Sequence, residues 1–124
     1  MSNKTYKIAV VDDENEILET ISTYLEKYGN YDVITFANPL KALDTIDISY
    51  DLVLLDIMMP QMNGLEVLER LIAINPNQKV VMMTAYSTLD KVLKAHKEGA
   101  THYFMKPFES MKALENKISE VLNP

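Results

Sequence analysis

Short apolar runs alternate with longer amphipathic segments along the chain. Five of these runs have the length of a β-strand, at 8–11, 33–36, 52–55, 80–83 and 103–105. The run Leu52-Val53-Leu54-Leu55 is apolar throughout, which is typical of a strand covered on both faces in a parallel sheet. The pattern therefore predicts β/α alternation around a parallel sheet.

Between most of these runs, apolar residues recur at helical spacing. The predicted buried stripes are Ile17, Ile21, Leu25 and Tyr28 in the first helix, Leu65, Leu68, Leu71 and Ile72 in the third, and Met111, Leu114, Ile118 and Val121 in the last. Gly29 is expected to end the first helix, Asn38-Pro39 to start the second, Asn75-Pro76-Asn77 to end the third and Gly99 to cap the fourth. No linker or repeat interrupts the alternation. We predict one (βα)5 domain over residues 1–124, a doubly wound α/β fold with a five-stranded parallel sheet in the flavodoxin-like order 2-1-3-4-5.

Composition narrows the class of protein. Hydrophobic residues make up 48% of the chain and charged residues 24%, as in globular domains. The net charge of −6 disfavours direct binding to nucleic acid. The absence of cysteine excludes disulfides and thiolate metal sites, and the apolar run at 8–11 is too short for a signal peptide or a membrane span. We expect a cytoplasmic protein.

Polar side chains follow four of the five predicted strands. Asp12-Asp13-Glu14 follows the first strand, Asp56 the third, Thr84 the fourth and Lys106-Pro107 the fifth. In an open parallel sheet, ligand sites form beyond the carboxyl ends of the strands. These side chains are therefore expected to gather at one edge of the sheet.

Carboxylates packed together repel one another unless they are protonated or neutralised by a cation. A hard divalent ion is the simplest solution, and Mg²⁺ prefers a set of oxygen ligands of this kind. A carboxylate can also attack phosphorus to give an aspartyl phosphate, and Asp56 is the best-placed nucleophile. Lys106, Thr84 and Mg²⁺ could then stabilise the transferred phosphoryl group.

Each of these residues also has a more ordinary interpretation. Taken alone, Asp12 or Asp13 is more simply interpreted as an N-cap of the first helix. Asp56 could be a loop acid, Thr84 a strand-end cap and Lys106 a solvated surface charge. The coincidence of suitable residues at four strand ends favours the functional interpretation.

The chain resembles the receiver domains of two-component response regulators over essentially its whole length. The motifs that carry the resemblance are Val11-Asp12-Asp13-Glu14, Leu54-Leu55-Asp56-Ile57-Met58-Met59-Pro60, Met62-Asn63-Gly64, Met83-Thr84-Ala85 and Met105-Lys106-Pro107-Phe108. Within that family, Met83-Thr84-Ala85-Tyr86 and the segment 99–108 are similar to the single-domain intermediate of the sporulation phosphorelay.

The resemblance implies that Asp56 accepts a phosphoryl group from a histidine kinase or a small phosphodonor. It implies that Asp13 binds Mg²⁺ directly, that Asp12 acts largely through water, and that the Met58 carbonyl is a further ligand. It also implies that Lys106 pairs with the phosphoryl group.

Further roles implied by the resemblance concern the switch. Lys106-Pro107 would be a cis peptide, and Thr84 with Tyr103 would form a switch pair that alters the surface of the fourth helix, fifth strand and fifth helix. Without the resemblance, Tyr103 would be read as a half-buried strand aromatic that does not move. Met58 and Tyr86 would flank the path of the attacking water, and neither is a good base, so we expect slow self-dephosphorylation.

The expected partners are a histidine kinase and either a downstream protein target or a histidine phosphotransferase, with the chain acting as a monomer. Such a protein catalyses only its own phosphorylation and dephosphorylation. A phosphatase with an Asp nucleophile is one alternative, but the families it resembles need a second Asp where this chain has Met58. A flavodoxin-like FMN carrier is another, but Asp12-Asp13-Glu14 would repel the phosphate of FMN. A phosphorylation-independent, receiver-like interaction module is the remaining alternative. Neither His96 nor His102 is assigned a catalytic role.

Overall fold

The structure, a computed structural model, describes residues 4–84, 102–106 and 110–124. Five parallel strands form one sheet in the order β2-β1-β3-β4-β5, as predicted. The strands are β1 (Tyr6–Val11), β2 (Tyr31–Phe36), β3 (Leu52–Asp56), β4 (Lys79–Thr84) and β5 (His102–Met105). They contain the predicted runs and extend most of them by one or two residues.

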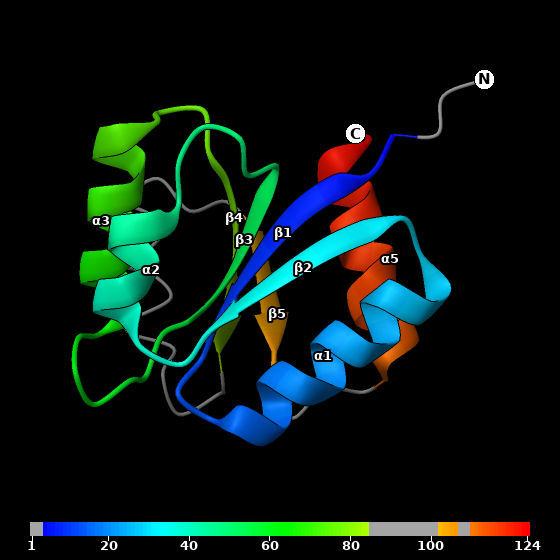
Figure 1. Cartoon of the computed structure of the whole chain (residues 1–124), viewed down its shortest axis with the longest axis horizontal. Coiled ribbons are helices and arrows are strands. Elements are labelled where there is room, and N and C mark those ends of the chain that lie inside the picture. Colours follow the sequence, from blue (N-terminus) through cyan, green and yellow to red (C-terminus); the bar gives the residue numbers. More distant parts are fainter. Residues whose placement is uncertain (1–3, 85–101, 107–109) are drawn as a thin grey trace.

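Helices cover both faces of the sheet (Figure 1). The described helices are α1 (Asn15–Tyr28), α2 (Pro39–Thr45), α3 (Gly64–Ile74) and α5 (Met111–Leu122). Figure 1 shows α1 and α5 on one face and α2 and α3 on the other. The predicted cap at Gly99 lies outside the described residues. None of the described helices combines the length and the apolar character needed to cross a bilayer.

The helix ends follow from local sequence. The Asn38 side chain accepts a hydrogen bond from the Leu40 N–H at the start of α2, where Pro39 is the first helical residue. Asn63 accepts one from the Glu66 N–H at the start of α3. Gly29 follows the last residue of α1, and Asn75 follows that of α3. These described ends confirm the predicted boundaries.

The strand β3 lies at the centre of the sheet and is buried along its whole length. Its side chains alternate between two hydrophobic layers. Val53 and Leu55 pack into the layer beneath α2 and α3, whereas Leu52 and Leu54 pack into the layer beneath α1 and α5. This double covering explains the unbroken apolar run and fixes the position of Asp56 at the end of the strand.

The predicted stripe of α1 is wrong at one position. Tyr28 is 57% exposed, whereas Leu18 is buried together with Ile21 and Leu25. Tyr28 lies in the last turn, where its ring packs against Tyr24 on the helix surface at a centroid distance of 4.6 Å. The aromatic pair, rather than the core, therefore accounts for this apolar position.

Two positions of this stripe, one buried and one exposed, make a test of the core. Ile21→Ala is expected to lower the free energy of unfolding by about 2–5 kcal/mol, because it leaves a cavity beneath a fully buried side chain. Tyr28→Ala removes an exposed aromatic contact and should cost less than about 1.5 kcal/mol. Urea unfolding of both variants measures the difference, and equal losses would contradict this assignment of the core.

Candidate functional site

Three carboxylates meet at the carboxyl edge of the sheet. Oxygen atoms of Asp12, Asp13 and Asp56 all lie within 4.8 Å of one another. Asp12 and Asp13 follow β1, and Asp56 ends β3, which is paired with β1 in parallel register. Asp12 is completely buried and Asp56 is 5% exposed. The strand order thus brings together acids that are 43 to 44 residues apart in sequence.

The turn after β1 holds Asp12 in place. Its backbone N–H donates to the Phe36 carbonyl oxygen over 3.1 Å, and its Oδ1 accepts a hydrogen bond from the Glu14 N–H over 2.9 Å. Glu14, not an aspartate, is the N-cap residue of α1, and no side chain provides a cap. The interpretation of Asp12 or Asp13 as the N-cap of α1 is therefore wrong. Glu14 holds that position, and the Asp12 side chain instead accepts a hydrogen bond from the Glu14 N–H from two residues earlier in the chain.

Lys106 supplies the positive charge nearest to these acids. Its Nζ lies 2.8 Å from Asp12 Oδ2, 3.4 Å from Asp56 Oδ1 and 3.8 Å from Glu14 Oε1. Only 17% of the lysine side chain is exposed. Its interpretation as a solvated surface charge is therefore wrong. Glu14 is not among the predicted site residues, although its place in the run Asp12-Asp13-Glu14 indicates that it borders the site.

The electrostatics of the site leave Asp56 poorly compensated. Burial, followed by the charge of Asp12, raises the pKa of Asp56 to about 6, although Lys106 and a hydrogen bond from the Met58 backbone favour the charged form. Burial alone would lower the pKa of Lys106, but its hydrogen bond to Asp12 and the charges of Asp56 and Asp12 raise it above the usual value. One lysine therefore faces more negative charge than it neutralises.

The donor set suits a hard divalent cation. Its three carboxylates provide oxygen ligands, which Mg²⁺ prefers, and among the described residues no histidine belongs to the cluster. Met58 follows Asp56 by two residues and its side chain is 52% exposed, so the side chain leaves the cluster while its backbone stays beside it. The residues present therefore fit Mg²⁺.

Other predicted site residues are placed only in part. Thr84 ends β4 opposite Met105 of β5, but its side chain lies outside the described part of the chain, as do Tyr86, Pro107 and therefore the Lys106-Pro107 peptide. Tyr103 is half-buried against the layer beneath α2 and α3, and burial raises the pKa of its hydroxyl. The expected pairing of Thr84 with Tyr103 therefore stays a prediction.

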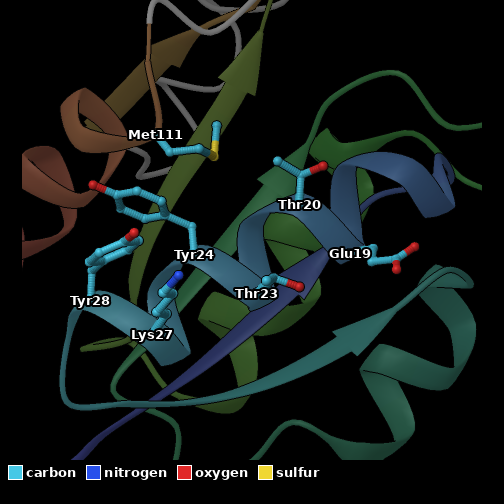
Figure 2. Close-up of a pocket in the computed structure, with 7 residues that line it drawn as sticks. All are labelled: Glu19, Thr20, Thr23, Tyr24, Lys27, Tyr28 and Met111. Carbon is cyan, nitrogen blue, oxygen red and sulfur yellow. The ribbon is translucent and has the colours of Figure 1, made fainter.

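A shallow groove of about 450 Å³ lies away from the acidic cluster, along the outer side of α1. Figure 2 shows the aromatic rings of Tyr24 and Tyr28 at one end and Met111 of α5 nearby. The residues lining the groove are Glu19, Thr20, Thr23, Tyr24, Lys27, Tyr28 and Met111. None of the predicted site residues is among them, so the predicted site does not coincide with this groove.

The described structure thus combines a doubly wound parallel sheet with a buried acidic cluster and a lysine at the carboxyl edge of the sheet. Residues 8–119 match the family model described as the response regulator receiver domain. The chain belongs to this family, as the motifs predicted. Receiver domains are signalling switches of two-component systems, and they bind Mg²⁺ at an acidic cluster of this kind.

Individual relatives agree with this assignment. Sporulation initiation phosphotransferase F of Bacillus subtilis is 40% identical over 104 residues, which are 83% of each chain. The chemotaxis protein CheY of Listeria monocytogenes is 36% identical over 88% of this chain and 92% of its own. The first similarity confirms the predicted likeness to the sporulation relay.

Solved structures show the same fold. A CheY-like receiver domain protein from Methanospirillum hungatei superposes with a TM-score of 0.89 at 34% identity, covering 97% of this chain and 95% of its own.

Three other sequence relatives are longer transcriptional regulatory proteins, of which the chain spans only 27%, 28% and 44%.

The raised pKa of Asp56 makes a prediction about stability and pH. Between about pH 4 and 6 the folded state binds more protons at Asp56 than the unfolded state, so its contribution to stability is lost as the pH rises through this window. Asp56→Asn cannot ionise. At pH 7.5 with EDTA, this substitution should raise the free energy of unfolding by about 1–2 kcal/mol. A pKa shift of about two units corresponds to about 3 kcal/mol, and screening by solvent makes the expected gain smaller.

Urea unfolding at pH 4.5 and 7.5 checks this, because the advantage of Asp56→Asn should shrink at the lower pH. Asp44→Asn, at an exposed acid of α2, is the control and should show no such pH-dependent gain. A variant that is no more stable than the wild type at pH 7.5 would show that Lys106 fully compensates Asp56.

Proposed function

We propose that this chain is a phosphoacceptor receiver domain that takes a phosphoryl group on Asp56 from a histidine kinase or a small phosphodonor, with Mg²⁺ as cofactor. The observation that carries the proposal is that Asp56 lies beside both Asp12 and Lys106. A nearly buried carboxylate with a raised pKa adjoins an acidic cluster suited to a cation and the ammonium group of Lys106. A carboxylate placed only for stability would not need this crowding.

In the proposed reaction, a carboxylate oxygen of Asp56 attacks phosphorus, and the bond from phosphorus to the donor nitrogen or oxygen breaks. The product is an aspartyl phosphate, and the electron pair leaves with the donor. Lys106 Nζ is 3.4 Å from Asp56 Oδ1, so a small movement would bring it to a phosphoryl oxygen. Mg²⁺, when bound, supplies positive charge that offsets the charge on the phosphoryl oxygens.

Separate residues of the chain would bind the cation and respond to the phosphoryl group. Asp12, Asp13 and Asp56 would hold the cation together with the Met58 carbonyl. Thr84 would follow the phosphoryl group, and Tyr103 would turn inward with it, so that phosphorylation changes the surface around β5.

We propose that residues 1–124 act as a single, monomeric domain in the cytoplasm. Its partners would be a histidine kinase and either a downstream protein or a histidine phosphotransferase, which returns the phosphate to a histidine. The name of the Bacillus subtilis relative as a phosphotransferase supports the relay, and similarity to a chemotaxis protein supports a switch that binds a protein target. Catalysis would be limited to the domain's own phosphorylation and dephosphorylation.

The alternative is a phosphorylation-independent interaction module. In such a module Lys106 would serve only to neutralise Asp12, and the pairing at 2.8 Å would be permanent. Lys106 Nζ also lies within ion-pair distance of Asp56, at 3.4 Å, which favours a lysine that serves the acceptor as well as Asp12.

Intact mass spectrometry separates these functions. Incubation with Mg²⁺ and acetyl phosphate should add one labile phosphoryl group to the wild-type protein, and none to Asp56→Asn. Asp44→Asn, which alters an exposed acid outside the site, should be phosphorylated like the wild type. Failure of the wild type to form an adduct with acetyl phosphate or with a phosphorylated histidine kinase domain would favour the interaction module.

A second prediction concerns the lifetime of the phosphate. Because Met58 and Tyr86 are poor bases, self-dephosphorylation should be slow, and Met58→Asn with Tyr86→Glu should shorten the half-life about tenfold or more by orienting water. Decay of the intact-mass adduct after removal of the donor measures it. An unchanged half-life would eliminate these positions as determinants.

A further inference from the structure

The loop between β3 and α3 is closed by a contact that leaves no space for a side chain. We propose that Gly64 is a positioning residue, which sets the geometry of Asp56 and of loop 57–63 for Mg²⁺ by allowing α3 to begin directly against the end of β3. The inference rests on the proposed metal site and adds to it a residue that binds no ligand.

The steric argument is direct. A Cβ atom at Gly64 would lie 2.7 Å from the Ile57 Cα and 3.0 Å from the carbonyl carbon of Asp56, and it would come closer still to the Asp56 carbonyl oxygen. All three atoms belong to the backbone. Unlike the tip of a flexible side chain, they can give way only if the strand, the loop or the helix moves.

The same contact includes a hydrogen bond. The Gly64 N–H donates to the Ile57 carbonyl oxygen over 2.7 Å and so joins the two ends of the loop. Loop 57–63 contains Met58, whose backbone hydrogen-bonds Asp56. A displacement of Gly64 would therefore be transmitted to both residues that we propose as ligands on this side of the cation.

The elements on either side of the contact are firmly held. Asp56 is in register with Met83 of β4, and the Ile57 N–H donates to the Met83 carbonyl oxygen over 3.3 Å. On the other side, Leu65 and Leu68 anchor the first turns of α3 in the core. An added methyl group would therefore displace the short loop between these elements, which carries Met58.

Mg²⁺ is sensitive to such a displacement. It demands near-ideal octahedral geometry with short bonds, whereas Ca²⁺ accepts irregular sites and longer bonds. The shift of the loop that is needed to relieve these short backbone contacts should therefore weaken Mg²⁺ much more than Ca²⁺. A purely structural role of Gly64 would instead lower stability and leave the ratio of the two affinities unchanged.

The test compares Gly64→Ala with Gly29→Ala by isothermal titration with Mg²⁺ and with Ca²⁺, after circular dichroism has shown that each variant is folded. At Gly29 an added Cβ would meet the Tyr31 ring, with Cδ2 at 2.6 Å, which is a side chain distant from the acidic cluster. We expect Gly64→Ala to weaken Mg²⁺ by about tenfold or more and Ca²⁺ by less than about threefold. Gly29→Ala should leave both affinities unchanged.

A folded Gly64→Ala variant whose Mg²⁺ to Ca²⁺ affinity ratio equals that of the wild type would overturn the inference. If the variant does not fold, amide hydrogen exchange of the wild type decides the question. Coupling between the contact and the cation is reciprocal, so saturating Mg²⁺ should slow exchange of the Gly64 amide and leave the Gly29 amide unchanged. A Gly64 amide that is indifferent to Mg²⁺ would likewise overturn it.

Failure of this inference is distinguishable from failure of the proposed function. If the function is wrong, wild-type protein forms no adduct on Asp56 with any donor. If only the inference is wrong, the wild type binds Mg²⁺ and is phosphorylated, and Gly64→Ala does so with the same metal preference.

Discussion

The repulsion between the buried carboxylates of Asp12 and Asp56 is the constraint on which the chemistry of this domain depends. Adjacent parallel strands place both acids at one edge of the sheet, and burial strengthens their interaction because little water screens it. Lys106 neutralises Asp12 at 2.8 Å and Asp56 less closely at 3.4 Å. Because of these unequal distances, the negative charge of Asp56 is the less completely compensated of the two.

The rest of the molecule keeps that uneven arrangement in place. Two hydrophobic layers, one on each face of the sheet, bury β3 completely and leave its end no freedom to relax away from Asp12. Close-packed interiors of this kind resist small displacements. The Lys106 side chain, rather than a movement of the backbone, therefore offsets the repulsion between the two acids.

Much of this was accessible from sequence because it depends on local pattern. Apolar runs predicted the strands, and helix-end residues such as Asn38 and Gly29 predicted the helix boundaries. The polar residues that follow the strands predicted the acidic cluster. Tyr28 was misassigned because helical spacing cannot distinguish a core contact from an aromatic pair on the surface. The preference of Lys106 for Asp12 over Asp56, and the steric demand at Gly64, depend on distances between strand ends that no local pattern encodes.

The ion pair of Asp12 with Lys106 joins residues that are 94 positions apart, nearly the two ends of the domain. Lys106 follows β5, an edge strand, so its charge reaches the acids only after the last strand has joined the sheet. A chain that has emerged from the ribosome only as far as β4 would carry all three acids without this counter-charge. The site therefore obtains its lysine only when the whole sheet has formed, which makes a complete site a marker of a completely folded domain.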